Sequence, residues 1–209
     1  MELRKKIASL TADRIYRHAL FYNYPGGLRI ELSEGGHPLD QVLVALRKAT
    51  AVCADIFGSN DLMLVHLQKF APASRYHFRK TLRELDLAGV KIPPTRDIWL
   101  EKNEEESWGE SDDRGYWVNV ACELPQSKLQ NLLWCAFVGD FGPLHPNPHC
   151  LVYLVNIEKE IVVHPYDDRG MDIIGGKFSP LRDLYEKHNA LLFDYDIEVM
   201  RKTFSPIGA

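Results

Sequence analysis

The sequence predicts an α+β fold in which helices pack on one face of a mainly antiparallel sheet. Two observations favour this class. Apolar residues at helical spacing dominate the first part of the chain, whereas short apolar runs typical of strands dominate the part after residue 115. The links between those later runs are short, which favours antiparallel hairpins over parallel strands joined by crossover helices. We expect a single domain across residues 1–209.

The first part of the chain is expected to alternate between helix and strand. Residues 1–25 form an N-terminal helical segment, which the run Tyr24-Pro25-Gly26-Gly27 ends. Residues 28–32 alternate apolar and charged side chains, as a half-buried strand does. The expected elements before residue 93 are helices over residues 3–22, 40–57 and 74–89, and strands over residues 28–32 and 62–67.

Residues 93–115 are predicted to be an irregular acidic insertion that begins at Pro93-Pro94. Apolar runs predict strands over residues 116–122, 132–138, 150–155, 161–164, 171–174 and 191–195. A short helix fits residues 126–130. Ser179-Pro180 predicts the start of another helix, because serine caps helices and proline suits the first turn.

Composition limits the class of protein and its location. The chain is 45% hydrophobic, which is enough for a substantial core, and no apolar run approaches the ~18 residues that span a membrane. The basic start, Met1 to Lys6, lacks the long apolar stretch of a signal peptide. The cysteines lie within apolar runs and form no Cys-x-x-Cys pair, so we expect reduced thiols in a cytoplasmic protein.

The charge is unevenly distributed. The formal net charge is −4, which disfavours nucleic-acid binding, because neutralising phosphates requires clustered lysine and arginine. Residues 101–114 hold seven acidic and two basic side chains, so this segment carries the whole imbalance. Trp108 within it is either an exposed anchor for a protein partner or a side chain that folds back onto the domain and leaves the acids solvated. The predicted partner-binding residues are Glu104, Glu105, Glu106, Trp108, Glu110, Asp112 and Asp113.

The densest charged motif follows the apolar run Ile161 to His164. As chemistry, its carboxylates could converge in a loop on a hard cation, and its arginine could hold a phosphate or carboxylate in a bidentate fashion. Such a site would belong to a hydrolase or a phosphoryl-handling enzyme. The catalytic residues on this alternative reading are His164, Asp167, Asp168, Arg169 and Asp172.

A structural reading explains the same motif as a turn between two strands. Aspartate can bond to nearby backbone amides, and glycine allows unusual backbone angles. The tetrapeptide Asp167-Asp168-Arg169-Gly170 also occurs as Asp112-Asp113-Arg114-Gly115, again directly before a strand-like run. We favour the structural reading, because a tetrapeptide that occurs twice, each time directly before a strand, indicates a role in starting that strand.

Other constellations are weaker. His145 and His149 have a His-x-x-x-His spacing, but Pro146 and Pro148 exclude the helix on which that spacing brings two ligands together. Cys150 or Cys135 with His164 or His149 could form a nucleophilic pair, although buried thiols are usually inert. Phosphate loops and dinucleotide fingerprints are absent. We therefore expect no cofactor and no metal.

Two motifs carry a family resemblance. The run Tyr166-Asp167-Asp168-Arg169-Gly170-Met171-Asp172-Ile173-Ile174, together with Gly27-Leu28-Arg29-Ile30-Glu31-Leu32, resembles the bacterial family catalogued as domain of unknown function 3885. The resemblance covers most of the chain and is concentrated in residues 27–32 and 147–174. It implies a shared fold and a bacterial origin, and it supplies no catalytic residues.

Three functional hypotheses follow. The first is a non-catalytic protein-binding domain, more specifically an immunity protein whose acidic segment neutralises a basic toxin domain. The second is the hydrolase or phosphoryl-handling enzyme. The third is a cellular domain with a small ligand of unknown identity. We expect another protein as partner, and neither nucleic acid nor membrane.

Overall fold

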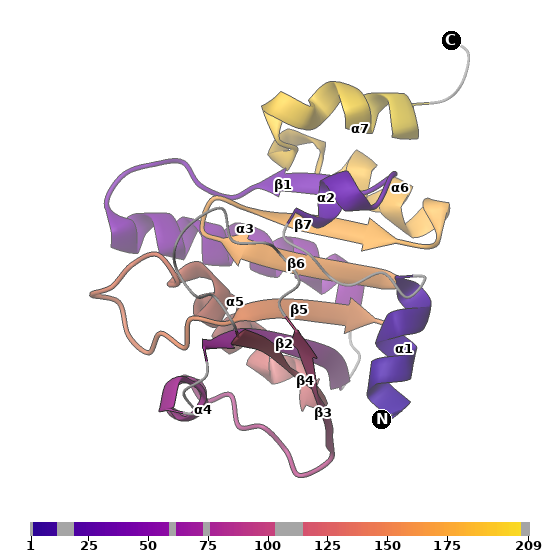
Figure 1. Ribbon diagram of the computed structural model, residues 1–209. Coiled ribbons are helices and arrows are strands. Elements are labelled where there is room, and N and C mark those ends of the chain that lie inside the picture. The colour runs from indigo at the N-terminus through magenta and orange to yellow at the C-terminus, as the bar shows by residue number, and fades with distance from the viewer. Residues whose placement is uncertain (1, 12–18, 59–61, 73–75, 103–114, 206–209) are drawn as a thin grey trace.

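The computed structural model describes the chain except for residues 1, 12–18, 59–61, 73–75, 103–114 and 206–209. The described strands form one seven-stranded sheet in the order β1-β7-β6-β5-β2-β4-β3 (Figure 1). Every neighbouring pair is antiparallel. The strands are β1 (Leu28–Glu31), β2 (Leu62–Pro72), β3 (Arg96–Lys102), β4 (Gly115–Pro125), β5 (Leu151–Asn156), β6 (Ile161–Asp167) and β7 (Gly170–Gly175).

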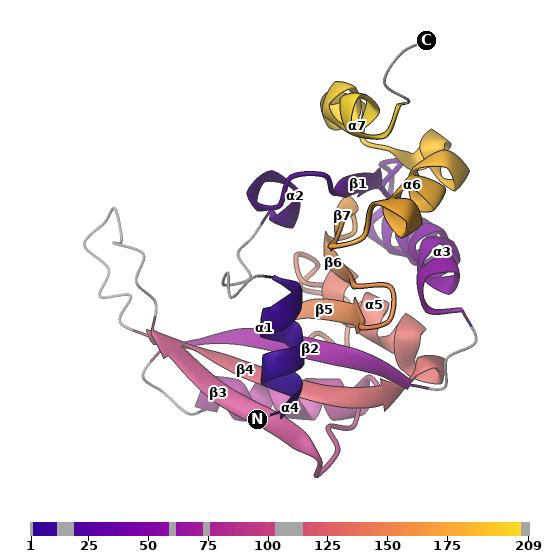
Figure 2. The same ribbon diagram turned by 90° about the vertical axis from the view of Figure 1, so that its right-hand side faces the viewer.

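Helices cover both faces of this sheet. The described helices are α1 (Glu2–Leu10), α2 (Leu20–Asn23), α3 (Pro38–Phe57), α4 (Tyr76–Leu87), α5 (Leu129–Phe137), α6 (Phe178–Lys187) and α7 (Ile197–Phe204). Figure 2 shows α2 on one side of β1 and β7, and α3 and α6 on the other. None of the helices in the described part of the chain is both long enough and apolar enough to cross a membrane.

The predicted α+β class is confirmed, with one refinement of the layers. The main core joins α3, α4, α5, α6 and α7 to one face of the sheet. A second cluster joins Ile7 of α1 and Leu20 of α2 to the opposite face, where Tyr153 and Val162 lie. Because both faces carry buried apolar side chains, both require a cover, and the helices are not confined to one face as predicted.

The predicted strand over residues 132–138 is wrong. Leu129–Phe137 is the helix α5, and the short helix expected just before it is a 3-10 turn over Gln126–Lys128. Leu132, Leu133 and Phe137 are fully buried. A helix buried on most sides reads as a continuous apolar run, and periodicity cannot distinguish that run from a central strand.

Three other expectations need correction. Residues 96–102, expected to be irregular, form the edge strand β3, while residues 103–114 lie outside the described part. The last predicted strand, over residues 191–195, is replaced by two 3-10 turns and one isolated bridge between Leu192 and Ile30. Of the predicted helix over residues 3–22, the described residues show two helices, Glu2–Leu10 and the short Leu20–Asn23, and residues 12–18 lie outside the described part.

The sheet opens at one end between its central strands. The ladder between β5 and β6 joins only Leu154–Asn156 to Ile161–Val163, although both strands continue. Beyond that point β5 pairs with β2, and β6 pairs with β7. The side chain of His164 bridges part of the opening, since its Nδ1 donates to the carbonyl of Val152 at 3.0 Å. This opening forms the floor of the groove described below.

Candidate functional site

The charged motif forms the turn between β6 and β7. Asp167 pairs with Gly170 across the ladder, so Asp168 and Arg169 make the turn itself. The Asp167 carboxylate accepts hydrogen bonds from the backbone N–H of Arg169 at 2.8 Å and from its Nε at 2.9 Å, and also pairs with its Nη2. The Arg169 carbonyl in turn accepts from the backbone N–H of Leu32, just beyond β1, at 2.9 Å. The motif therefore holds its own turn and ties the turn to the edge of the sheet.

The glycines that end the two Asp-Asp-Arg-Gly copies have the same surroundings. Gly170 and Gly115 each begin a strand, β7 and β4. A Cβ at Gly170 would collide with the ring of Tyr166 and lie 2.8 Å from a backbone oxygen, and one at Gly115 would collide with the ring of Phe70 and lie 2.9 Å from a backbone oxygen. In both copies an aromatic side chain of the adjacent strand covers a strand-initial glycine, an arrangement that pins strand register.

Asp172 and His164, the two other residues of the alternative catalytic reading, lie away from the turn. Both point to the sheet face that α1 and α2 cover, where the register places Asp172 opposite His164 on one side and Arg29 on the other. Asp172 is fully buried. It accepts a hydrogen bond from the backbone N–H of Phe21 at 3.0 Å, so it anchors α2 to β7.

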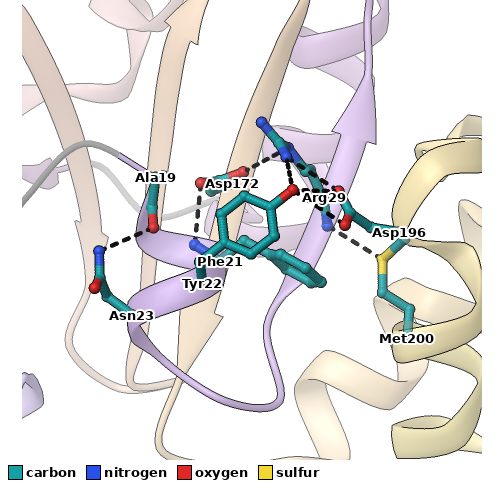
Figure 3. Close-up of polar contacts among 8 residues, drawn as sticks. All are labelled: Ala19, Phe21, Tyr22, Asn23, Arg29, Asp172, Asp196 and Met200. Atoms are coloured by element: carbon teal, nitrogen blue, oxygen red, sulfur yellow. Dashed lines mark hydrogen bonds and ion pairs between the residues drawn. The ribbon is translucent and has the colours of Figure 1, made fainter.

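Arg29 is the centre of a charged cluster that includes Asp172 (Figure 3). The Arg29 Nε lies 3.5 Å from Asp172 Oδ1. Its Nη1 donates to Asp196 Oδ2 at 3.0 Å and to the Tyr22 hydroxyl at 2.6 Å, and that hydroxyl donates to Asp196 at 3.1 Å. The cluster therefore joins α2, β1, β7 and the turn before α7 through one guanidinium group.

Aromatic rings surround the same guanidinium. Its central carbon lies 5.1 Å from the ring of Tyr22, 5.5 Å from that of Tyr166 and 5.2 Å from that of Phe193, within the range of cation–π attraction. Burial works against the charge of Arg29, but Tyr166, Asp196 and Asp172 raise its pKa above the ordinary value. Arg29 is thus a permanently charged, largely enclosed group.

The pKa of Asp172 predicts a pH dependence of stability. Burial raises this pKa from 3.8 to about 6, although Phe21 and Arg29 oppose the shift. The folded state binds the proton more strongly than the unfolded state, so the ionised form costs stability above pH 6 and this cost disappears as the pH falls. From pH 7 to pH 4, we expect the free energy of unfolding of the wild type to rise by about 2 kcal/mol relative to Asp172→Asn in urea titrations.

A matched control for that titration is Asp183→Asn, which changes an exposed carboxylate on α6. Its difference from the wild type should stay nearly constant over the same pH range. A wild type whose stability changes with pH in parallel with Asp172→Asn would show that Asp172 does not titrate with folding.

A row of rings crosses this sheet face toward β3. Trp99, His66, Tyr153 and His164 stack in sequence, with ring centroids 5.0, 5.4 and 4.3 Å apart. Tyr166 follows edge-on to His164 at 6.3 Å. Burial lowers the pKa of His66 to about 4, so its ring is neutral at pH 7. The row fills the face with flat rings as far as the Arg29 cluster.

A groove of about 690 Å³ lies where the sheet opens, next to Arg29. Its lining includes Tyr166 and Asp167 of β6, Lys69 of β2 and Leu151 of β5. The groove size falls within the range of small-molecule sites. Its lining residues include Arg29, Lys69, Phe70, Trp117, Asp140, His149, Tyr166, Asp167, Arg169 and Phe193.

The residues of the alternative catalytic reading do not meet at one point. Asp167 and Arg169 lie at the groove, whereas His164 and Asp172 lie on the covered face of the sheet. Asp168 is buried in the turn, and burial, followed by Asp167, raises its pKa. Within the described part of the chain, no three histidine, cysteine, aspartate or glutamate side chains are placed to hold a metal ion.

Several other predicted sites can be located. All four cysteines are buried and free, and burial raises the pKa of Cys150 to about 12, which leaves the thiol protonated. His145 lies 3.6 Å from Glu84, while His149 lines the groove. The predicted partner-binding residues, which fall within 104–113, lie outside the described residues.

Sequence reasoning missed Arg29, Asp196 and Lys69 as site residues. Arg29 was read as the charged half of an alternating strand, and nothing local distinguishes a solvated arginine from one that faces a buried aspartate. Asp196 lies beyond the last predicted strand. The only available signal was that Arg29 and Asp172 belong to the two motifs that carry the family resemblance.

Taken together, the structure defines an α+β domain with a seven-stranded antiparallel sheet and an arginine-centred cluster beside a groove. The chain belongs to the family defined by the Domain of unknown function (DUF3885), whose model matches residues 3–196. It is 43% identical over 44 residues to the uncharacterized protein YnaE of Bacillus subtilis (strain 168), a match that spans 21% of each chain. No solved structure matches.

Proposed function

We propose that this chain is a non-catalytic protein-binding domain and that it binds its partner at the sheet edge formed by β3. The supporting observation is the exposure of large apolar side chains there: Ile98 is 51% exposed and Leu100 is 61% exposed. Both lie on the same side of the strand. Contiguous exposed apolar surface on a globular domain is typical of a protein–protein contact.

A hollow of about 270 Å³ adjoins these side chains. It lies between α4 and the end of the sheet, and α4 covers this corner only in part, since Leu82 remains 39% exposed. Its apolar lining consists of Phe78, Leu82, Val90, Ile92, Ile98 and Val120. A partner side chain inserted there would bury apolar area, which contributes about 25 cal/mol per Å².

The backbone of β3 offers a second mode of contact. In the described part of the sheet, β3 pairs with β4 alone, so the backbone groups on its outer side have no strand partner. Such an edge can accept an added strand from another chain. A partner that adds a strand at β3 would place alternate side chains beside Ile98 and Leu100 on the same sheet face.

The chemistry of the partner follows from the sequence between β3 and β4. These strands end at Lys102 and resume at Gly115, so the acidic segment connects the two strands of the proposed surface. We infer a basic partner, namely a toxin domain that the chain neutralises as an immunity protein in the bacterial cytoplasm. Carboxylates beside an apolar patch would steer such a partner and then dock it.

The role of the charged turn supports a non-catalytic function. Asp167 and Arg169 satisfy each other and the turn backbone, and Asp172 anchors α2. These contacts stabilise the fold. None of them involves the exposed side chains of β3, Ile98 and Leu100.

A second candidate, a hydrolase or phosphoryl-handling enzyme, is favoured by one observation. Asp168 and Asp172 are buried carboxyl groups with raised pKa values, a property common among catalytic acids and bases. Turnover of p-nitrophenyl phosphate or p-nitrophenyl acetate that Asp168→Asn or Asp172→Asn abolishes would support it. Unchanged background hydrolysis in both variants would remove it.

The protein-binding proposal predicts a charge-dependent contact. The chain should recover a basic toxin domain from its source bacterium, and co-expression should relieve the growth defect that this domain causes. Changing Glu104, Glu105 and Glu106 to lysine should weaken binding at least tenfold at moderate salt, because three attractive charges become repulsive. Affinity can be measured by titration calorimetry with the purified domain.

Matched surface variants distinguish a specific apolar contact at β3 from nonspecific hydrophobic binding. Ile98→Lys with Leu100→Lys should also weaken binding at least tenfold and leave the melting temperature unchanged. Leu43→Lys, at an exposed leucine on α3, should leave binding intact. Equal recovery of the toxin domain by the wild type, the triple glutamate variant and the β3 variant would contradict the proposal.

A further inference from the structure

The groove at the sheet opening is lined by aromatic rings. Phe70 and Trp117 line it with their ring centroids 5.5 Å apart, and Tyr166 and Phe193 line it beside Arg29. The opening arises from the topology, because β5 and β6 stop pairing before either strand ends. A groove of about 690 Å³ with such a lining can take a flat molecule of modest size.

The arginines of the groove are already balanced by carboxylates. Arg29 faces Asp172 and Asp196. Arg169 pairs with Asp167 and lies 3.9 Å from Asp140, and these two aspartates are the acidic residues that line the groove. An added anion would therefore find little unsatisfied charge at either arginine.

Lys69 differs from both arginines. Its Nζ donates to the carbonyl of His149 at 2.6 Å, and no carboxylate of the described residues forms an ion pair with it. Burial lowers the pKa of Lys69, and Lys80 adds to this effect. Burial also lowers the pKa of His149, and Lys69 and Lys80 lower it further. Among the described residues, the ammonium group of Lys69 is therefore the cation of the groove that no carboxylate pairs with.

We propose that the groove binds a small aromatic anion, either a carboxylate or a phosphate ester, with the anion at Lys69 and the ring against Phe70 and Trp117. A half-buried ammonium group gains more from a charge-assisted hydrogen bond than an exposed one does, because less water competes. The adjacent rings supply the apolar contact that an inorganic ion cannot use. This site is separate from the β3 edge, so either one can fail without the other.

The test uses simple probes of that chemistry. Benzoate and phenyl phosphate carry the two possible anions on a ring, benzyl alcohol carries the ring without charge, and inorganic phosphate carries charge without the ring. Binding is followed in ¹H–¹⁵N spectra through the indole N–H of Trp117, assigned with Trp117→Phe. We expect at least one aromatic anion to shift this signal with an affinity at least tenfold above those of benzyl alcohol and inorganic phosphate.

Two lysine variants assign the anion contact. Lys69→Met keeps an unbranched side chain and removes its charge, and it should lower the affinity for the aromatic anion at least tenfold. Lys202→Met, at an exposed lysine on α7, should leave the affinity unchanged. If Lys69→Met does not fold, the salt dependence of the wild type replaces it, and affinity should fall at least threefold between 50 and 500 mM salt.

The outcomes are distinct. Binding of benzoate alone identifies a carboxylate ligand, binding of phenyl phosphate alone identifies a phosphate ester, and binding of both supports the shared chemistry. The proposal is overturned if neither binds, if benzyl alcohol binds as well as the anions, or if Lys69→Met binds as well as the wild type. Loss of toxin binding by the β3 variants would not affect any of these results.

Discussion

Replacing Arg29 with alanine is expected to lower the free energy of unfolding by about 3–5 kcal/mol at pH 7. The variant leaves Asp172, which is 0% exposed, and Asp196 buried without their shared cation. It also removes the stacking of Arg29 between Tyr166 and Phe193. Urea unfolding followed by circular dichroism measures the loss. At pH 5 the loss should be smaller, because Asp172 can then take up a proton.

Arg169→Ala is the matched control, since this side chain is 66% exposed and Asp167 keeps the hydrogen bond from the backbone N–H of residue 169. Its cost should stay below about 1 kcal/mol. Arg29→Lys should recover only part of the stability, because a single ammonium group cannot reproduce a planar, multi-donor contact. Equal losses for Arg29→Ala and Arg169→Ala would show that the cluster is not the main electrostatic tie of the fold.

Gly170→Ala is expected to cost about 3 kcal/mol. The new methyl group would meet the Tyr166 ring and lie 2.8 Å from the carbonyl oxygen of Ile30, a backbone atom that cannot move without disturbing the β1–β7 ladder. The thermal midpoint should fall by roughly 6 °C or more for a domain of this size, as measured by calorimetry.

Gly142→Ala tests whether that loss is specific, because no atom lies within 4 Å of a Cβ at Gly142. Its effect should be within about 0.5 kcal/mol of zero. A Gly170→Ala variant as stable as Gly142→Ala would mean that the turn relaxes easily. The close covering of Gly170 by Tyr166 would then have no role in setting the register of β7.

The fold class was predictable because most elements carry a clear local period. The helix α3 and the strands β2, β4 and β6 were placed by patterns that their burial explains. The failures have physical causes. The segment α5 is buried on most sides and so lost its helical period, and β3 lies at a sheet edge where Ile98 and Leu100 remain exposed, so no alternation marks it.

Only part of the candidate site could be predicted from the sequence. The motif at Asp167–Asp172 could be located, because its charge density is high and it follows an apolar strand. Its division between two sheet faces could not be foreseen, because that depends on a register irregularity between Pro165 and Asp167. Arg29 and Lys69 reach the groove through pairing between strands far apart in the chain, and local pattern contains no information about such pairing.

The pairing of β1 with β7 also sets the order of events during synthesis. The ribosome releases β1 near the beginning, yet among the described strands its only ladder partner emerges more than a hundred residues later. Until then Leu28 and Ile30, which are fully buried in the folded protein, have no neighbouring strand beside them. The β1–β7 ladder can therefore form only after residues 170–175 have been synthesised, and until then the nascent chain carries an apolar segment that other unfinished chains could contact.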